Sequence, residues 1–417
     1  MSDLYIVEGR RTPFCKMGTL LSRELPSSLG SCASKAAISS AGVSLEEIDE
    51  VIFGCVGQPA SEMNIARIIG SRIGLPEETP ALTVHRNCAS GLEAITYAAT
   101  KAKAEEGDTF LVGGTESMSQ MPLLFSSGAS EKFFSLFGAR SLTEKIKAFS
   151  KFRVKDMIPQ VSLRMGLSDP ISGINMGQTA EILARELEIT RGEQDAFAFL
   201  SHEKASANKS KISEEICPVY TSNEDCIRSP NGRFVDSDNG VRSDTTISKL
   251  NGLKPIFEKR GGTVTAGNSS QVTDGSVALI LMTEKALNKT GCSPIAKIKN
   301  YTHVGCSPKR MGLGPFFALK KMGANLKDID LIEINEAFAV QALACKKLIN
   351  ENISEIPEDK INVNGGAIAL GHPVGASGAR IVLTLAKELQ RRDAKRGIAT
   401  LCVGGGQGSA IEIETCK

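Results

Sequence analysis

The stretch AGVSLEEIDEVIFG at residues 41–54 is repeated as MGANLKDIDLIEIN at residues 322–335, with Asp49 opposite Asp330. Two further matches follow in the same order. In the first, NCASGLEAITYA resembles GASGARIVLTLA, with Ser90-Gly91 opposite Ser377-Gly378. In the second, FLVGGTES (110–117) resembles TLCVGGGQ (400–407), with Gly113 opposite Gly404. The separation between partners drifts only from 281 to 291 residues along the chain. Three matches in register indicate an internal duplication, because chance similarity of apolar runs would not preserve order and spacing.

The duplication predicts two similar α/β halves, residues 1–117 and about 255–417, with the first half completed by part of 251–285. Each half alternates short apolar runs, such as DEVIFGCV and TFLVGG, with stretches of helical pattern. Strands that alternate with helices predict layered α/β structure with parallel sheets. Helices on both faces of these sheets explain why the strands are almost wholly apolar.

Residues 118–250 match neither half and are predicted to be a long insertion in the first one. Within the insertion, residues 131–156 hold five of the sixteen Phe residues and seven Lys/Arg against three Asp/Glu. A basic amphipathic helix with Phe on one face can lie on a membrane or bind a partner. The alternative, which we favour, is a cover whose Phe side chains pack on the protein body or form an oligomer contact.

The composition excludes several classes of protein. The 417 residues are 41% hydrophobic and 23% charged, which is ordinary for a globular protein. A net charge of +2 argues against general nucleic-acid binding, and no apolar run approaches the ~18 residues of a membrane span. The eleven cysteines are scattered without a C-x-x-C pair, and the four histidines are widely spaced. We therefore expect a reduced, cytoplasmic protein without a metal site.

Two residues could carry nucleophilic catalysis, one as the nucleophile and the other as its base. Cys88, in NCASG, precedes a helix whose unpaired N–H groups and dipole favour a thiolate over a thiol. His372, in GGAIALGHPVGASGAR, lies among glycines that would bring the backbone close around it, where an imidazole could act as general base for a thiol. Each has a simpler explanation, a packing cysteine or a hydrogen-bonded loop histidine.

Two further candidates lie at the ends of predicted strands. Cys402 precedes the glycine run 404–406, whose backbone N–H groups could form an oxyanion hole. Asn335 and Glu336 end a strand on the side where ligands bind in α/β sheets. The alternatives are an inert buried thiol and a helix-capping Asn. The glycine-rich stretches lack the G-x-G-x-x-G pattern with a downstream acidic residue, so NAD is not expected.

Taken together and in this order, these motifs resemble the thiolase family. The resemblance covers nearly the whole chain: RTPF (11–14), NCASG (87–91), GGTESMS (113–119), TVTAGNSS (263–270), NEAF (335–338), GGAIALGHPVGASGAR (365–380) and CVGGG (402–406). It implies a duplicated αβαβα layered fold with an inserted loop domain. It also implies that the insertion at 118–250 binds CoA.

The resemblance implies roles for the four candidates. Cys88 would take the acyl group from acyl-CoA as a thioester after activation by His372. Asn335 would hold a water that completes one oxyanion hole, and the backbone N–H groups of Cys88 and Gly404 would form the second. Cys402 would exchange the α-carbon proton of acetyl-CoA, as base in condensation and acid in thiolysis. Coenzyme A and acetyl-CoA are then substrates, and no permanently bound cofactor or metal is implied.

The resemblance also implies contacts with the substrate. Ser270 matches a position near the pantetheine arm of CoA, and Arg242 one near its nucleotide end. Met176 and Phe338 are expected to line the acyl pocket. A decarboxylating ketoacyl synthase would pair its cysteine with two histidines, whereas this chain has Asn335 and Cys402 in those motifs.

Three departures from the family pattern bear on acyl chain length. Asn175 stands where short-chain biosynthetic thiolases carry His, the helix after 311–315 is about one turn shorter than expected, and 131–156 is longer and more basic. The longer insertion favours a 3-ketoacyl-CoA thiolase of fatty-acid β-oxidation. The resemblance to the family implies a homodimer or homotetramer. A multifunctional β-oxidation partner or a membrane surface would be contacted through 131–156. The alternatives are a short-chain acetyl-CoA acetyltransferase and a non-catalytic CoA- or lipid-binding subunit.

Overall fold

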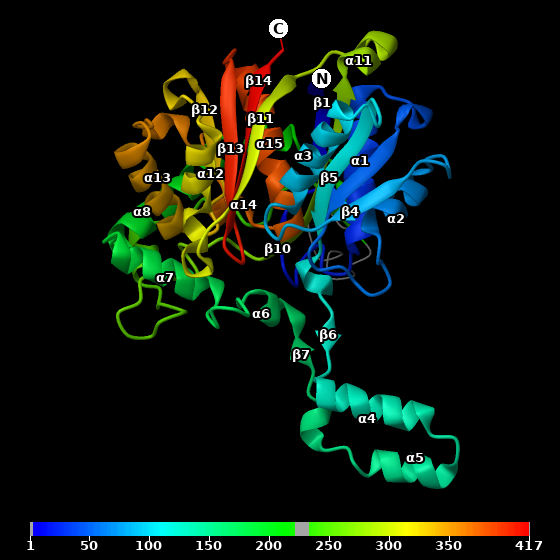
Figure 1. Cartoon of the computed structure of the whole chain (residues 1–417). Helices are drawn as coiled ribbons and strands as arrows, with labels where there is room; N and C mark the ends of the chain where they lie inside the picture. Colours follow the sequence, from blue (N-terminus) through cyan, green and yellow to red (C-terminus); the bar gives the residue numbers. More distant parts are fainter. Residues whose placement is uncertain (1–2, 222–232, 417) are drawn as a thin grey trace.

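A computed structural model describes residues 3–221 and 233–416, so that 222–232 of the predicted insertion lie outside the described residues (Figure 1). The strands are β1 (Leu4–Arg11), β2 (Cys15–Lys16), β3 (Glu50–Gly54), β4 (Ala81–Val84), β5 (Thr109–Glu116), β6 (Leu123–Leu124), β7 (Gln160–Val161), β8 (Val219–Tyr220), β9 (Phe234–Val235), β10 (Thr273–Thr283), β11 (Ala296–Gly305), β12 (Leu331–Ile334), β13 (Arg396–Val403) and β14 (Gln407–Thr415). The helices are α1 (Pro26–Ala41), α2 (Ile65–Ile73), α3 (Ser90–Lys103), α4 (Ser127–Gly138), α5 (Leu142–Phe149), α6 (Ser162–Gly166), α7 (Met176–Glu186), α8 (Arg191–Ala207), α9 (Lys209–Ser213), α10 (Ile247–Asn251), α11 (Glu284–Thr290), α12 (Gly314–Met322), α13 (Ala339–Asn352), α14 (Ala367–Leu370) and α15 (Val374–Arg391).

The main sheet runs in the order β12-β13-β14-β11-β1-β10-β5-β3-β4, with β2 paired to β10. Strand β3 is parallel to β4 and β5, and β12 is parallel to β13, whereas the inner pairs are antiparallel. The expectation of parallel sheets is therefore wrong for the inner strands. The physical reason is visible at residues 404–406, where a short turn joins β13 directly to β14 and so forces antiparallel pairing.

The predicted layers are present. Helices α3 and α15 lie in the centre, packed between strands of the two halves, while α1 and α2 cover the outer face of the first half and α12 and α13 that of the second (Figure 1). Every residue of β5 and β10 is buried. Strands covered on both faces need apolar side chains along most of their length, which accounts for FLVGG in β5 and VALILM in β10.

The repeated motifs occupy equivalent places in the two halves. Asp49 accepts hydrogen bonds from the backbone N–H groups of residues 108 and 109, and Asp330 accepts the same pair from residues 395 and 396. Gly91 and Gly378 lie where α3 and α15 cross. A Cβ at Gly91 would come within 2.8 Å of the Ala379 nitrogen, and one at Gly378 within 2.5 Å of the Leu92 nitrogen. The repeated glycines are therefore needed for the central helices to approach each other.

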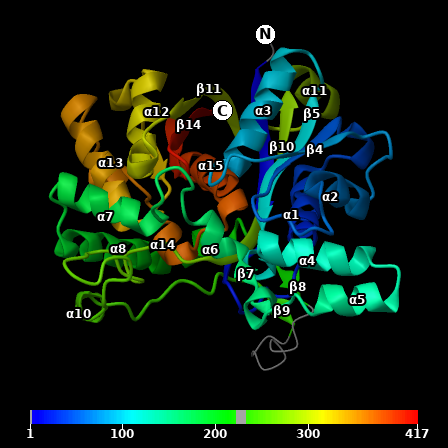
Figure 2. The same cartoon turned by 60° about the horizontal axis from the view of Figure 1, so that its bottom comes forward.

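The predicted insertion divides into two parts. Helices α7 and α8 pack on α13 of the second half, whereas α4 and α5 stand away from the body on the two-stranded ribbon of β6 and β7 (Figures 1 and 2). This second part contains residues 131–156. The expectation that their Phe side chains pack on the body is wrong, because Phe134, Phe137 and Phe149 are exposed. The oligomer contact that was expected as its alternative stays a prediction.

Candidate active site

One cavity of about 170 Å³ gathers most of the residues singled out in the sequence. Its lining comes from both halves and from the insertion. The predicted residues that line it are Cys88, Met176, Ser270, Phe338, His372, Cys402 and Gly404. The cavity lies where parallel strands of each half end, since Cys88 follows β4 and Gly404 follows β13. Two duplicated halves thus contribute to one site.

Cys88 lies two residues before α3 and is half-buried. Asn87 adopts a φ of 42°, and its side-chain Nδ2 donates to the Gly404 carbonyl at 2.7 Å, which links the cysteine turn to the glycine run of the other half. Burial raises the pKa of the Cys88 thiol, while backbone hydrogen bonds from Gly404 and Cys88 itself act in the opposite direction. The expected thiolate is therefore not favoured in the free protein, because desolvation outweighs the helix terminus. A base is needed to remove the proton.

His372 is buried in the turn between α14 and α15 and is held by its backbone N–H, which donates to the Gln271 carbonyl at 2.9 Å. Its Nδ1 lies 2.5 Å from Ser377 Oγ, and Ser377 Oγ donates to the Pro373 carbonyl at 3.0 Å. Because the hydroxyl has one proton, Nδ1 must donate to it, which leaves Nε2 free to accept a proton. Burial, with a smaller effect of Arg380, lowers the pKa of His372 to about 4. The imidazole is therefore neutral near pH 7.

Cys402 is the next to last residue of β13 and is almost fully buried. Burial raises the pKa of its thiol, and the neighbouring Cys88 raises it further. A thiol with a raised pKa holds its proton and can donate it to a strong base such as an enolate. The two cysteines thus face one cavity from different halves of the chain.

Asn335 and Glu336 are both buried at the end of β12, but neither lines the cavity. Neither side-chain atom of Asn335 has a hydrogen-bond partner among the described residues. A buried amide without partners is costly, and an ordered water would satisfy it. The role of Asn335 in an oxyanion hole stays a prediction.

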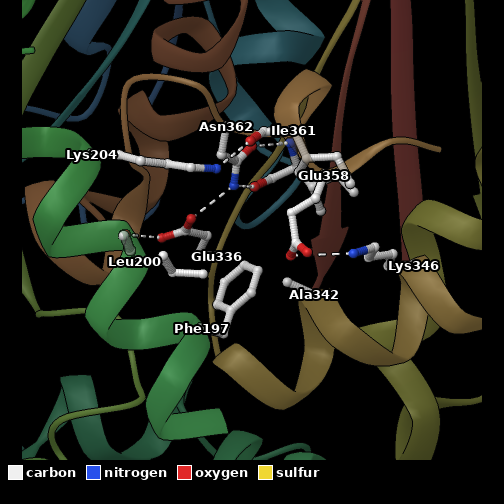
Figure 3. A pocket seen from close by; sticks show the side chains of 11 residues that line it. Phe197, Leu200, Lys204, Glu336, Ala342, Lys346, Glu358, Ile361 and Asn362 are labelled. Carbon is white, nitrogen blue, oxygen red and sulfur yellow. Dashed lines mark hydrogen bonds and ion pairs between the residues drawn. The ribbon is translucent and has the colours of Figure 1, made fainter. Parts of the chain in front are cut away.

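Glu336 has a different position. Its carboxylate accepts hydrogen bonds from Ser201 Oγ at 2.6 Å, Asn362 Nδ2 at 2.8 Å and the Ile368 backbone N–H at 3.2 Å. It borders a small cavity of about 20 Å³ beside α8, which has room for about one water (Figure 3). Since Ile368 belongs to α14, Glu336 fixes the helix that precedes His372.

The predicted substrate residues differ in position. Met176 begins α7, and Phe338 packs edge-on against Phe257 with 6.1 Å between ring centroids, so both present apolar groups to the cavity. Ser270 also lines it. Arg242 does not, and its side chain is exposed outside the cavity. The role of Arg242 at the nucleotide end of CoA stays a prediction.

One buried carboxylate near the site was missed in the sequence. Glu116, at the end of β5, accepts hydrogen bonds from the backbone N–H groups of Val56 (3.1 Å), Gly57 (2.8 Å) and Gly375 (2.9 Å). It therefore ties the loop after β3 to the start of α15, three residues beyond His372. Burial raises the pKa of Glu116 to about 7. An acidic residue directly after an apolar strand, within GGTESMS, was the available signal.

Comparisons with known proteins agree with this geometry. Residues 4–285 match the family model of the thiolase N-terminal domain, and residues 292–415 match that of the thiolase C-terminal domain. The chain belongs to the thiolase family. It is accordingly an acyltransferase, which transfers an acyl group between CoA and acetyl-CoA.

The similar proteins carry two different names. The mitochondrial 3-ketoacyl-CoA thiolase of Homo sapiens is 40% identical over 423 residues, covering 100% of this chain and 99% of the relative. The acetyl-CoA acetyltransferase of Cupriavidus necator is also 40% identical, over 99% and 100% of the two chains. The crystal structure of the human mitochondrial 3-ketoacyl-CoA thiolase in complex with CoA superposes with a TM-score of 0.87 at 38% identity, over 100% and 98% of the two chains.

Proposed function

We propose that this protein is a 3-ketoacyl-CoA thiolase of fatty-acid β-oxidation, which cleaves 3-ketoacyl-CoA with CoA through a thioester on Cys88. The observation that carries the thiolase chemistry of this proposal is the meeting of Cys88, His372 and Cys402 on one largely apolar cavity. Cleavage of a carbon–carbon bond with formation of a thioester requires two thiols and a neutral imidazole. One thiol attacks, the imidazole takes its proton, and the second thiol supplies a proton to the departing carbon.

In the first half-reaction the sulfur of Cys88 adds to the C3 carbonyl carbon of the substrate as its proton passes to His372 Nε2. The bond between C2 and C3 then breaks, and its electron pair leaves on the enolate of acetyl-CoA. Cys402 gives its proton to C2 of that enolate, which completes acetyl-CoA. The acyl group stays on Cys88 as a thioester.

In the second half-reaction CoA arrives as a thiol and loses its proton to the Cys402 thiolate left by the first half-reaction. Its sulfur attacks the thioester carbon, the bond to Cys88 breaks, the Cys88 sulfur takes back its proton from His372 Nε2, and acyl-CoA leaves. Negative charge develops on the acyl oxygen in each addition, close to the Gly404 and Cys88 backbone groups that already bond to the Cys88 sulfur. Donors fixed before the reaction stabilise such charge without reorganisation.

The lining of the cavity supports substrates longer than acetoacetyl-CoA. Asn175 lines the cavity, but its side chain caps α7. Its Oδ1 accepts a hydrogen bond from the backbone N–H of Gln178 at 2.9 Å. An Asn engaged in a helix cap occupies less of the cavity than an imidazole in its place would. Flexible apolar side chains, among them Leu167 and Met311, form another part of the wall.

A short-chain acetyl-CoA acetyltransferase is the second candidate. It is favoured by the Cupriavidus necator relative, which carries that name and is as similar to this chain as the human 3-ketoacyl-CoA thiolase. The catalytic groups serve both reactions, so the length of the acyl chain distinguishes them.

The test is CoA-dependent thiolysis of a series from acetoacetyl-CoA to long-chain 3-ketoacyl-CoA, with Cys88→Ala as the inactive control. We expect kcat/KM to rise with chain length. Activity confined to acetoacetyl-CoA would replace the proposal with the acetyltransferase. Full activity of Cys88→Ala would contradict both functions.

A further inference from the structure

The two-helix arm formed by residues 123–161 carries its own small core. Phe133 lies between Phe125 and Phe152, with 4.9 Å between ring centroids in each pair. Lys132 Nζ pairs with Asp156 Oδ2 at 2.6 Å, and Ser141 begins α5 with a capping box to Glu144. The arm is therefore an ordered unit that stands away from the body (Figure 1).

The outer faces of this arm are apolar. Leu142, Ile146 and Phe149 follow each other at helical spacing along α5, and Phe134 and Phe137 lie on α4. Their exposed fractions run from 61% to 79%. An amphipathic helix of a soluble protein normally buries such a stripe against its own core. Here both helices expose it, which marks an interaction surface.

The same arm concentrates positive charge. Residues 131–156 carry a net charge of +4, against +2 for the whole chain, so the remainder of the protein is net negative. Two of the three acidic groups are engaged within the arm, Asp156 by Lys132 and Glu144 by the backbone N–H groups of the α5 cap. Within the described residues, Lys132 is the arm cation with an ion pair. The other six cations are left to meet charge from outside.

We propose that this arm docks the protein on a membrane surface that contains anionic lipid. Exposed Phe, Leu and Ile side chains enter the boundary between headgroups and acyl chains, and the surrounding Lys and Arg side chains meet lipid phosphates. No helix among the described residues is long and apolar enough to cross a bilayer. The arm therefore lies on the membrane.

Charge also decides between a membrane and a second copy of this chain. Two arms packed on each other would bring two groups of net charge +4 together, which opposes association. An anionic surface satisfies the apolar stripe and the unpaired cations at once.

The test is co-sedimentation of the full chain with vesicles of phosphatidylcholine, with and without phosphatidylglycerol, at low and high salt. The arm variant is Phe137→Ser/Leu142→Ser, at side chains 79% and 75% exposed. The matched control is Met63→Ser/Ile171→Ser, at 79% and 85% exposed but outside the arm. Thermal unfolding and light scattering report the folded state and the mass of each variant.

We expect the wild type and the control to bind vesicles containing phosphatidylglycerol, with binding weakened by salt. The arm variant should bind vesicles at least about tenfold more weakly, because it lacks two apolar side chains that the membrane would bury. Lys145→Glu/Lys147→Glu should lose a similar factor, since each cation near an anionic surface contributes about fivefold. Equal binding of arm variant and control, or no wild-type binding, would overturn the proposal. A change of mass in the arm variant without any lipid binding would assign the arm to an oligomer contact and also overturn it.

Discussion

Replacing Ser377 with alanine isolates one hydrogen bond of the active site. Ser377 Oγ lies 2.5 Å from His372 Nδ1 and gives its own proton to the Pro373 carbonyl at 3.0 Å, so the imidazole must carry its proton on Nδ1. The substitution leaves that buried N–H without an acceptor, which costs about 1–3 kcal/mol. It also permits the other tautomer, in which Nε2 is protonated and cannot accept the proton of Cys88.

The expected result is a fall in kcat of about 5- to 150-fold, the same free energy expressed as a rate. KM should change little, because Ser377 does not line the cavity. Steady-state thiolysis of acetoacetyl-CoA and of a longer 3-ketoacyl-CoA measures both quantities. Ser276→Ala is the matched control, since Ser276 is equally buried and also gives its hydroxyl proton to a carbonyl, that of Gly114 at 3.0 Å. Both variants should lose similar stability, measured by denaturant unfolding.

A kcat for Ser377→Ala as high as that for Ser276→Ala would refute the tautomer assignment. A rise in KM with kcat unchanged would equally refute it, because it would place Ser377 in substrate binding. Ser377 acts through His372, so it is a positioning residue.

Three further predictions follow from the structure. Asn175→His should lower kcat/KM for long-chain substrates more than for acetoacetyl-CoA, since the imidazole takes space in the cavity; a uniform change across the thiolysis series would contradict it. Burial raises the pKa of Glu116 to about 7, from an unfolded value near 4.5. Between these two pH values the folded state holds a proton on Glu116 that the unfolded state has released. The contribution of Glu116 to the free energy of unfolding therefore falls as the pH rises from 4.5 to 7. Glu116→Gln should flatten that fall, measured as denaturant midpoints at the two ends of the range; an unchanged pH slope would count against it. Burial raises the pKa of Glu333 to about 8, although Arg380 Nη1 at 3.1 Å acts in the opposite direction. Arg380→Met should raise that pKa further, so that stability keeps falling with pH above 8, where the contribution of Glu333 in the wild type levels off. Denaturant unfolding from pH 7 to 10 measures this, and an unchanged pH dependence would contradict it.

Much of the fold followed from the internal duplication. The match of Asp49 with Asp330 reports a real equivalence, because each carboxylate caps the start of a neighbouring strand through the same two backbone N–H groups. The repeated glycines at the crossing of α3 and α15 were visible for a similar reason, since only glycine fits there. Strand direction was not predictable in the same way. It depends on which strand a connection returns to, and apolar runs carry no record of that.

The cavity residues were predicted from turn motifs, but their electrostatics were not. The position of Cys88 before a helix suggested a thiolate, whereas burial from elements far apart in sequence raises its pKa. The exposed Phe side chains of the arm were also mispredicted. Helical spacing of apolar residues indicates a face that needs covering, and it does not tell whether that cover comes from the same chain.

The central claim is that Cys88 carries the acyl group. Intact-protein and peptide mass spectrometry after incubation with acetoacetyl-CoA, followed by a rapid acid quench, tests it most directly. We expect the added mass of one acetyl group on the peptide that contains Cys88, and this added mass should disappear when CoA is supplied. An acetyl group on the Cys402 peptide instead, or turnover without any acylated peptide, would contradict it.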